Sequence, residues 1–502
     1  MRGGTDQHIA AVEETLDPAD WDAARDLVTR VAAEAVDYLR DVRSRPVWRD
    51  MPLEIRARFT TPLPHGPTPL AEVVQAVFDT AMAYPMGNVH PRFWSWYMGA
   101  GNLTGALGEF LAAVQGSNLG GGNHAAARMD DQVVGWLKEM VHFPADASGT
   151  LVSGGSEANL IGLTVARNVM AGIDVRAEGI GTAPQPLRFY ASDQVHGCHL
   201  KAVEALGLGR KALRLIPTNE DFRIDLNALR AAIAEDQAAG LKPACLIGTA
   251  GTVNTGAIDD LVALADLAAA ERMWFHVDGC IGALIAIAPE GAPLIVGLER
   301  ADSLAMDPHK WLHAPFEAGC ALVRDAKAHR SSYAQSSEYL EPTARGLAAA
   351  PWLYDLGPQT SRGFRALKIW MALMEHGAAK FGRLIDQNIA QAKYLDALIR
   401  QSPELEIAAP TCINIVCFRH RPRIDLDAEG LKHWNVEIML RLQEEGVAAV
   451  SDTTVKGTHC LRVAITNHRT RRSDIDLMVA RVRDIAKALL ATMQSAKATE
   501  AV

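Results

Sequence analysis

Short apolar runs alternate with helical patterns through the middle of the chain. Between residues 149 and 325 these runs are GTLVSGG, LRFYASD, ACLIGTAG, MWFHVDG, SLAMD and GCALVRD. The first five are separated by stretches with apolar residues at helical spacing, for example SEANLIGLTVARNVM and DDLVALADLAAAERM. Continuous apolar strands that alternate with helices are typical of a parallel sheet covered on both faces. The pattern predicts an α/β fold, in which ligands bind at the carboxyl ends of the strands.

The flanking segments predict further elements. Apolar positions at helical spacing predict a helix from about residue 23 to 43, and the aromatic run HPRFWSWYMGAGN (90–102) predicts a strand. The weak pattern over residues 331–357 predicts a loop or flap, and a long helix follows it. Beyond about residue 382, helices alternate with the apolar runs INIVCFRH and CLRVAITN, which predicts a smaller C-terminal α+β domain.

Composition narrows the class of protein. The 502 residues are 49% hydrophobic and 22% charged, which is normal for a globular protein with a substantial core. The net charge is -9 without an evident basic patch, so we expect no nucleic-acid partner. No apolar run approaches the ~20 residues of a membrane helix, and the polar start lacks a signal region, so we expect a cytoplasmic protein without a membrane partner. The seven scattered cysteines, never in CxxC spacing, argue against a disulfide framework and a zinc site.

A lysine interrupts the mostly apolar run ADSLAMDPHKWLHAP (301–315). Burying the ammonium group of Lys310 is costly unless the site neutralises it or uses it. Enzymes bury lysines to make the amine a nucleophile, often toward an aldehyde. The alternative is a lysine that extends from a strand end into solvent. This stretch alone leaves both interpretations open.

Three other candidate groups follow predicted strands. The glycines and serine of SGGSEAN (153–159) expose backbone N–H groups at a helix start, which suits a phosphate, although an ordinary capped helix has the same pattern. His196 follows a strand and could stack on a flat ring or transfer a proton, although a lone loop histidine usually does neither. Asp278 ends the strand WFHVD, so its carboxylate needs a cationic partner or caps the next turn.

Together these features supply a phosphate cradle, a ring partner, a carboxylate and an amine. Pyridoxal phosphate needs all four, because a lysine carries it as a Schiff base and an acid keeps its pyridinium nitrogen protonated. The joint pattern is far more specific than any of its parts. A partial glycine fingerprint, GAGNLTG, lacks its third glycine and only weakly suggests a nicotinamide cofactor.

The strings SGGSEANL, SDQVHGCHLKAVEALGLG, FHVDGCIGA and ADSLAMDPHKWLHAP resemble the group II pyridoxal-phosphate-dependent amino acid decarboxylases. This family includes the aromatic-L-amino-acid, tyrosine, histidine and glutamate decarboxylases. The resemblance implies fold type I, with a mostly parallel, seven-stranded-type sheet in a large domain, and an obligate homodimer with active sites at its interface. It implies an N-terminal segment (1–120) that contributes to the dimer and the substrate pocket, a large cofactor-binding domain (121–380) and a small C-terminal α+β domain (381–502).

The resemblance also assigns roles to particular residues. Lys310 would form the Schiff base with the cofactor, and Asp278 would pair with the pyridinium nitrogen. His196 would stack on the ring and assist protonation of the carbanion. Gly155, Ser156 and His309 would contact the phosphate, and Thr252 would lie near the cofactor. Trp96 and Tyr97 would lie near the substrate side chain.

Some positions differ from the aromatic-acid members of the family. Asp307 stands where those members often have asparagine, and we expect its carboxylate to point away from the phosphate. Gly279 and Cys280 replace small alanines. The loop tyrosine that protonates the substrate carbon in those enzymes aligns with Ala349, with Tyr339 and Tyr354 nearby, so the proton donor is not assigned.

We expect decarboxylation of an L-amino acid to the amine and CO2. The three aromatics of FWSWY favour an aromatic substrate, although such a run can also be mostly core. The alternatives that keep the cofactor are an aldehyde synthase, which combines decarboxylation with oxidative deamination, and a C–C lyase. A cofactor-binding protein without catalysis is a further alternative, and Lys310, Asp278 and His196 argue against it.

Overall fold

The computed structural model describes residues 14–335 and 343–500. Backbone contacts divide the chain into two compact units, residues 1–45 with 50–85 and residues 46–49 with 86–502. Within the described residues, no helix is both long and apolar enough to span a bilayer. The expected domain boundaries, between an N-terminal segment, a large domain and a small domain near residues 120 and 380, stay a prediction.

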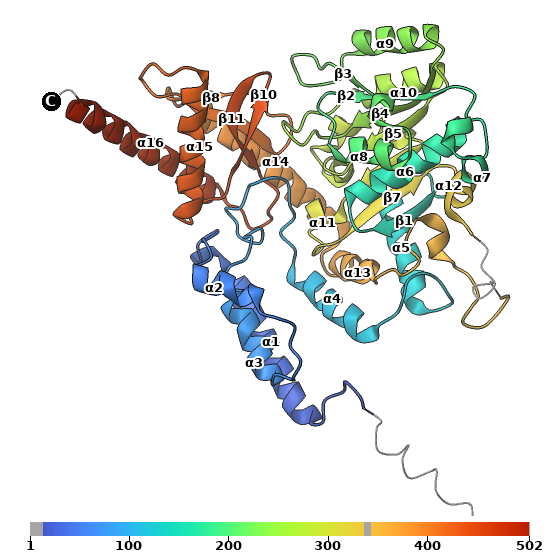
Figure 1. Cartoon of the computed structure of the whole chain (residues 1–502), viewed down its shortest axis with the longest axis horizontal. Coiled ribbons are helices and arrows are strands. Elements are labelled where there is room, and N and C mark those ends of the chain that lie inside the picture. The colour runs from blue at the N-terminus through green and yellow to red at the C-terminus, as the bar shows by residue number, and fades with distance from the viewer. Residues whose placement is uncertain (1–13, 336–342, 501–502) are drawn as a thin grey trace, which may run out of the picture. The chain divides into compact units, whose positions relative to one another are not determined.

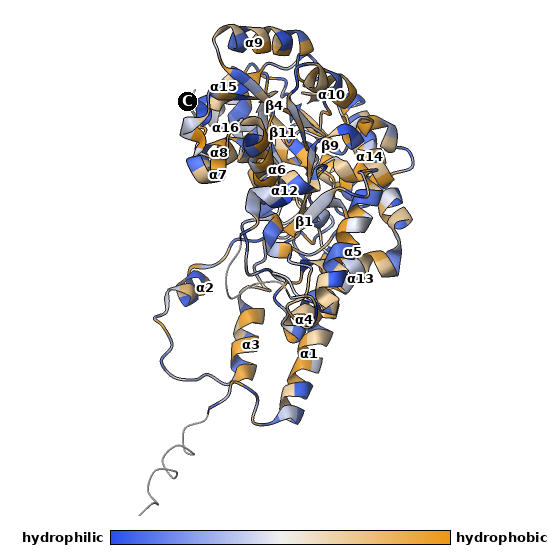
Figure 2. Ribbon diagram, turned by 90° about the vertical axis from the view of Figure 1, so that its right-hand side faces the viewer, coloured by the Kyte–Doolittle hydropathy of each residue, from blue (hydrophilic) through white to orange (hydrophobic). Residues whose placement is uncertain are grey.

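The first unit consists mainly of helices α1 (Trp21–Arg40), α2 (Leu53–Ala57) and α3 (Leu70–Asp79). The Asp20 side chain caps α1 by accepting hydrogen bonds from the Asp22 and Ala23 amides. Neither α1 nor α3 buries any residue. Both helices contain apolar residues, and the ribbon is coloured orange at such positions in Figure 2.

The second unit is built on a seven-stranded sheet with strand order β1-β7-β6-β5-β4-β2-β3 (Figure 1). Strand β7 runs antiparallel to β1 and β6, and the other pairs are parallel. This confirms the expected mostly parallel fold type I sheet. The strands are β1 (Ser148–Val152), β2 (Leu187–Ser192), β3 (Leu213–Ile216), β4 (Lys242–Thr249), β5 (Trp274–Asp278), β6 (Ser303–Met306) and β7 (Gly319–Val323).

Helices cover both faces of this sheet, which explains why the strands read as continuous apolar runs. Along β4, Leu246 packs in one core cluster, whereas Cys245 and Ile247 pack in another. The helices of this part are α4 (Leu103–Gln115), α5 (Ala125–Met140), α6 (Gly155–Met170), α7 (Val175–Glu178), α8 (Cys198–Ala205), α9 (Leu226–Ala238), α10 (Leu261–Ala270), α11 (Pro308–Trp311), α12 (Ala326–Tyr333) and α13 (Arg365–His376).

The C-terminal part contains the expected smaller sheet, which is antiparallel with order β10-β11-β9-β8. Its strands are β8 (Leu405–Ile407), β9 (Ile415–His420), β10 (Ser451–Val455) and β11 (Thr458–Ala464), and its helices are α14 (Ala378–Arg400), α15 (Ala428–Glu444) and α16 (Arg472–Glu500).

The aromatic run over residues 90–102 is not a strand, so that expectation was wrong. Phe93 makes only an isolated bridge to Ala449, and the fully buried Trp94 packs in the core of the small sheet. Trp96 has a φ of 52°, a left-handed conformation that turns the chain and breaks strand pairing. The aromatic side chains of this run therefore do not lie along one strand but pack separately, for example Trp94 in the core of the small sheet.

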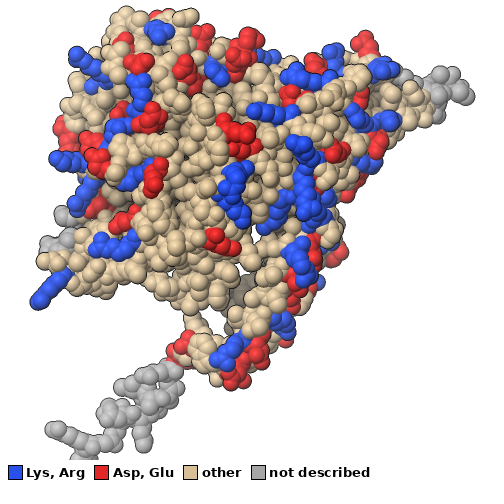
Figure 3. Space-filling model, turned by 180° about the vertical axis from the view of Figure 1, so that it is seen from behind, with Lys and Arg blue, Asp and Glu red and all other residues tan. Residues whose placement is uncertain are grey.

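Acidic and basic side chains are intermingled over the surface drawn in Figure 3. The expected absence of a nucleic-acid partner rests on the sequence and stays a prediction.

Candidate active site

A cavity of about 570 Å³ lies at the carboxyl ends of the strands of the large sheet. Its volume is in the range typical of small-molecule sites. The structure brings eight of the nine predicted site residues to its wall, namely Trp96, Tyr97, Gly155, Ser156, His196, Asp278, His309 and Lys310.

Lys310 lies on the short helix α11, shortly after β6. Its Nζ atom is 2.8 Å from Oδ2 of Asp307 and 5.6 Å from the centre of the Tyr97 ring. Burial disfavours the charge on this amine, but the Asp307 carboxylate outweighs that effect and raises the pKa of Lys310 above its ordinary value. The buried carboxylate of Asp307 thus faces this amine on the cavity wall, and its orientation relative to the phosphate stays a prediction.

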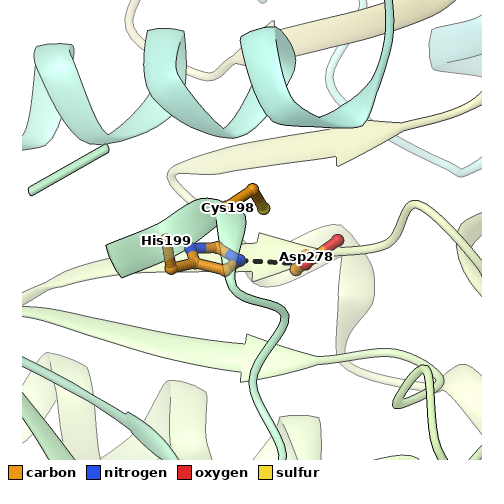
Figure 4. Close-up of side chains that lie close together, drawn as sticks. All are labelled: Cys198, His199 and Asp278. Atoms are coloured by element: carbon orange, nitrogen blue, oxygen red, sulfur yellow. Dashed lines mark hydrogen bonds and ion pairs between the residues drawn. The ribbon is translucent and has the colours of Figure 1, made fainter. Parts of the chain in front are cut away.

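Asp278 ends β5, the middle strand of the sheet, and its side chain is almost completely buried. The fully buried His199 donates its Nε2–H to Oδ2 of Asp278 at 2.9 Å, and the Cys280 amide donates to Oδ1 at 3.2 Å. Figure 4 shows the His199 ring, from the first turn of α8, directed at this carboxylate. Burial alone would raise the pKa of Asp278, but the two hydrogen bonds and the charge of Lys310 hold that pKa well below its ordinary value.

The side chains of Cys198, His199 and Asp278 each offer an atom that could ligate a metal, all within 4.8 Å of one another. A cysteine binds metals as the thiolate, and burial raises the pKa of the Cys198 thiol to about 12. The Nε2–H of His199 is already donated to Asp278. We therefore interpret this cluster as hydrogen-bonded support for the carboxylate.

The N-terminus of α6 opens onto one end of the cavity. The first-turn amides of Gly155 and Ser156 have no acceptor within their own helix, and such groups attract anions. A Cβ atom at position 155 would lie 2.8 Å from Oδ2 of Asp307, so the close approach requires glycine. Nδ1 of His309 accepts the Ala318 amide at 3.2 Å, which leaves its Nε2 to carry the hydrogen at this end of the cavity.

His196 follows β2 and lines the same cavity. Its Nδ1 accepts the Cys198 amide at 3.2 Å, so its Nε2 carries the hydrogen in the neutral ring. The ring is therefore held by its own helix start, with a donor available for a bound group.

Trp96 and Tyr97 add aromatic side chains to the cavity wall. Trp96 is 55% exposed, whereas Tyr97 is buried and donates its hydroxyl to Oδ1 of Asn414 at 3.2 Å. The buried Arg462 of β11 also reaches this wall and donates to the backbone carbonyls of Trp96 and Val253. This arginine thus fixes the conformation of the loop that presents Trp96.

Thr252 is the one predicted site residue that does not line the cavity. Its buried hydroxyl lies 2.9 Å from the Thr255 hydroxyl and accepts the Ala257 amide at 3.1 Å. These bonds hold the loop after β4, so contact of Thr252 with the cofactor stays a prediction. The neighbouring Thr249 does line the cavity.

The expected flap lies partly outside the described residues, and Tyr339 falls in that gap. The Tyr354 ring packs edge-on against Trp352, and its hydroxyl lies 3.5 Å from the Gln335 carbonyl. Tyr354 and Ala349 do not line the cavity formed by the described residues.

The sequence interpretation missed two residues of this site, His199 and Arg462. His199 stands three positions after His196, in the run SDQVHGCH, and at that spacing it lies on the first turn of α8. Arg462 interrupts the apolar strand CLRVAITN, which is the same signal that singled out Lys310. Both signals were present, but their partners come from distant parts of the chain.

The residues of the cavity fit pyridoxal phosphate. They combine an amine, an ionised carboxylate, an imidazole ring and a helix N-terminus, the four groups that this cofactor requires. Among the described residues, Oδ1 of Asp307 and Oγ1 of Thr249 are buried polar atoms on this cavity without a hydrogen-bond partner. Such atoms are uncommon in folded proteins unless another molecule satisfies them.

Comparisons with known proteins agree with this fit. Residues 52–421 match the pyridoxal-dependent decarboxylase conserved domain. The aromatic-L-amino-acid decarboxylase of Bacillus atrophaeus is 31% identical, over 90% of this chain and 93% of its own. The phenylacetaldehyde synthase of a Rosa hybrid cultivar is 29% identical, over 97% of this chain and 98% of its own.

The crystal structure of Oryza sativa TDC with PLP and tryptamine superposes with a TM-score of 0.87 and 27% sequence identity. The superposition covers 95% of this chain and 100% of that one. The likeness therefore extends over both sheets of the second unit. The chain belongs to the pyridoxal-dependent decarboxylase family.

Proposed function

We propose that this pyridoxal-phosphate-dependent carboxy-lyase converts an aromatic L-amino acid to its amine and CO2, with Lys310 and Asp278 as its central catalytic residues. The observation that carries the proposal is the meeting of a buried amine and a buried ionised carboxylate on one cavity wall. The tryptamine-bound Oryza sativa structure and the Bacillus atrophaeus relative support an aromatic substrate.

Each residue of the cavity has a defined task in this proposal. When bound, pyridoxal phosphate supplies a protonated ring that accepts the electron pair released as CO2 leaves. Lys310 would hold the cofactor through its amine. Asp278 would keep the proton at the ring nitrogen, and His196 would offer its Nε2–H to the bound group. The amides of Gly155 and Ser156 and the ring of His309 would bind the phosphate.

Trp96 and Tyr97 support recognition of a flat side chain. An exposed indole and a buried phenol ring on one wall provide apolar contact for an aromatic substrate. The cation of Arg462 on this wall holds the Trp96 backbone, so the aromatic wall is set before the substrate arrives.

The proposal is tested by aerobic turnover of a panel of L-amino acids with added pyridoxal phosphate, recording CO2, amine, aldehyde and peroxide together. We expect CO2 and the matching amine from an aromatic acid. Lys310→Ala abolishes this turnover, because among the described residues Lys310 is the one lysine on the cavity wall. Lys242→Ala, which loses a lysine bonded to the Met170 carbonyl, keeps it.

Near-normal activity of Lys310→Ala would show that the scheme is wrong. CO2 accompanied by aldehyde and peroxide would instead identify the oxidative reaction, the class to which the Rosa relative's name assigns that protein. A cofactor-loaded protein that releases no CO2 from any acid would refute decarboxylation while leaving cofactor binding intact.

The ion pair between Asp307 and Lys310 leads to a separate prediction about the rate of cofactor uptake. Its carboxylate raises the pKa of Lys310, so the amine is protonated at neutral pH and must lose that proton to attach the cofactor. Asp307→Asn keeps the shape of the side chain and removes the charge. We expect uptake at pH 7 to become about tenfold faster, the effect of lowering the amine pKa by about one unit.

Stopped-flow absorbance across a pH series measures this effect. The uptake rate of the wild type rises with pH, and the Asp307→Asn profile moves to lower pH. Asp325→Asn, which changes a cap of α12, serves as the control. Identical profiles for Asp307→Asn and the wild type would contradict the coupling between Asp307 and Lys310.

We propose further that the protein is a homodimer. Helix α4 carries an exposed apolar stripe, with the side chains at 45–71% exposure in Leu103, Leu107, Phe110, Leu111 and Val114. In the first unit, α1 and α3 bury no residue although they carry several large apolar side chains. An exposed apolar stripe such as that of α4 is typical of a protein interface.

Phe110→Glu and Val114→Glu place charges within the α4 stripe, and we expect each to convert the dimer into single chains. Light scattering coupled to size-exclusion chromatography measures the mass directly. Leu477→Glu, at a similarly exposed apolar position on α16, is the control and stays dimeric. A wild-type protein with the mass of one chain would refute the homodimer.

We also propose a cytoplasmic location. All seven cysteines are unpaired, and free thiols persist in reducing compartments. Fluorescence of the tagged chain in fractionated cells tests this, and recovery with secreted proteins would contradict it.

A further inference from the structure

The contact behind Asp278 is itself unusual, because a fully buried histidine holds a buried carboxylate that must remain charged. His199 has no exposed surface, and Asp278 is 6% exposed. Their hydrogen bond of 2.9 Å joins the first turn of α8 to the end of β5 (Figure 4).

The hydrogen bonds determine the tautomer of His199. An ionised carboxylate only accepts, so Nε2 of His199 carries the hydrogen. Within the described part of the chain, Nδ1 of His199 has no hydrogen-bond partner. A second proton on the ring would therefore leave a buried N–H group unsatisfied, which is costly. His199 is consequently a neutral donor.

The groups around this pair are neutral as well. His276 packs edge-on against His199 at 6.0 Å and is hydrogen bonded at both ring nitrogens, to Ser303 and Asn159. Burial lowers the pKa of His276 to about 3 and raises the pKa of the Cys280 thiol well above its ordinary value. The charge of the Lys310 amine also acts on Asp278, and it reaches the carboxylate from the cavity side.

A neutral donor at His199 affects the charge of Asp278 differently from a cation at the same place. An arginine or lysine behind Asp278 would cancel the carboxylate's charge and weaken its attraction for a protonated ring nitrogen. A neutral imidazole fixes the orientation of the carboxylate and leaves its full negative charge facing the cavity.

We propose that His199 is a positioning residue, which orients Asp278 and preserves its charge for the proton on the cofactor's ring nitrogen. This role rests on the proposed placement of pyridoxal phosphate in the cavity. His199 acts through its hydrogen bond to Asp278 and does not itself line the cavity formed by the described residues.

Cofactor affinity tests the role without reference to turnover. The dissociation constants of pyridoxal phosphate and of its 1-deaza analogue, which has a C–H in place of the ring nitrogen, are measured by fluorescence titration. For His199→Leu we expect pyridoxal phosphate to bind about tenfold more weakly than to the wild type, as for the loss of a hydrogen bond to a charged group. The deaza analogue binds to both proteins equally, within about twofold, because it lacks the atom on which His199 acts.

Two further variants separate positioning from folding. His199→Gln keeps a neutral N–H donor, and we expect it to restore most of the affinity for pyridoxal phosphate and the wild-type visible absorbance of the bound cofactor. His329→Leu removes another buried histidine, bonded to Ser148 and the Leu356 carbonyl outside the cavity, and we expect its ratio of the two dissociation constants to match the wild type.

If His199→Leu bound pyridoxal phosphate and the deaza analogue more weakly by the same factor, His199 would be a structural residue only, and the proposal would be overturned. Unchanged binding of pyridoxal phosphate would overturn it as well. A wild-type protein that binds no pyridoxal phosphate would instead refute the placement of the cofactor, and the role of His199 with it. If His199→Leu does not fold, an affinity of His199→Gln lowered equally for both cofactors would likewise overturn the proposal.

Discussion

A charged carboxylate in the interior of the large sheet is the constraint on which the site depends. Removing the charge of Asp278 from water is costly, so the surrounding groups must compensate for it. His199 and the Cys280 amide do so with hydrogen bonds, and Lys310 does so with its charge across the cavity. The same burial that makes the carboxylate costly also strengthens its interaction with any cation placed before it.

The topology of the sheet brings these groups together. Strand β5 is the middle strand and carries Asp278, and the neighbouring β6 leads into the helix of Lys310. The connections that follow β1 and β2 add Gly155 at one helix start and His196 and His199 at another. Parallel strands end at one edge, so residues far apart in sequence meet there, as open α/β sheets commonly arrange their ligand sites.

Much of this arrangement could be predicted from the sequence, because buried parallel strands leave a strong apolar signal. The exceptions have physical reasons. The edge strand β3 was missed because it is short and only partly buried, and the turn at Trp96 overrides an aromatic pattern typical of strands. The ion pair of Asp307 with Lys310 was not predicted, because charge repulsion from a phosphate was the only interaction of Asp307 that the sequence suggested. The partners of His199 and Arg462 are distant in sequence, so no local pattern reveals them.

The central claim is that Asp278 keeps a proton on the ring nitrogen of the bound cofactor. Nuclear magnetic resonance of protein loaded with pyridoxal phosphate carrying ¹⁵N in the ring measures that protonation directly. We predict the chemical shift of a protonated pyridinium, unchanged from pH 7 to about pH 9, because the pKa of Asp278 lies well below this range. The shift of an unprotonated pyridine at pH 7 would contradict this claim.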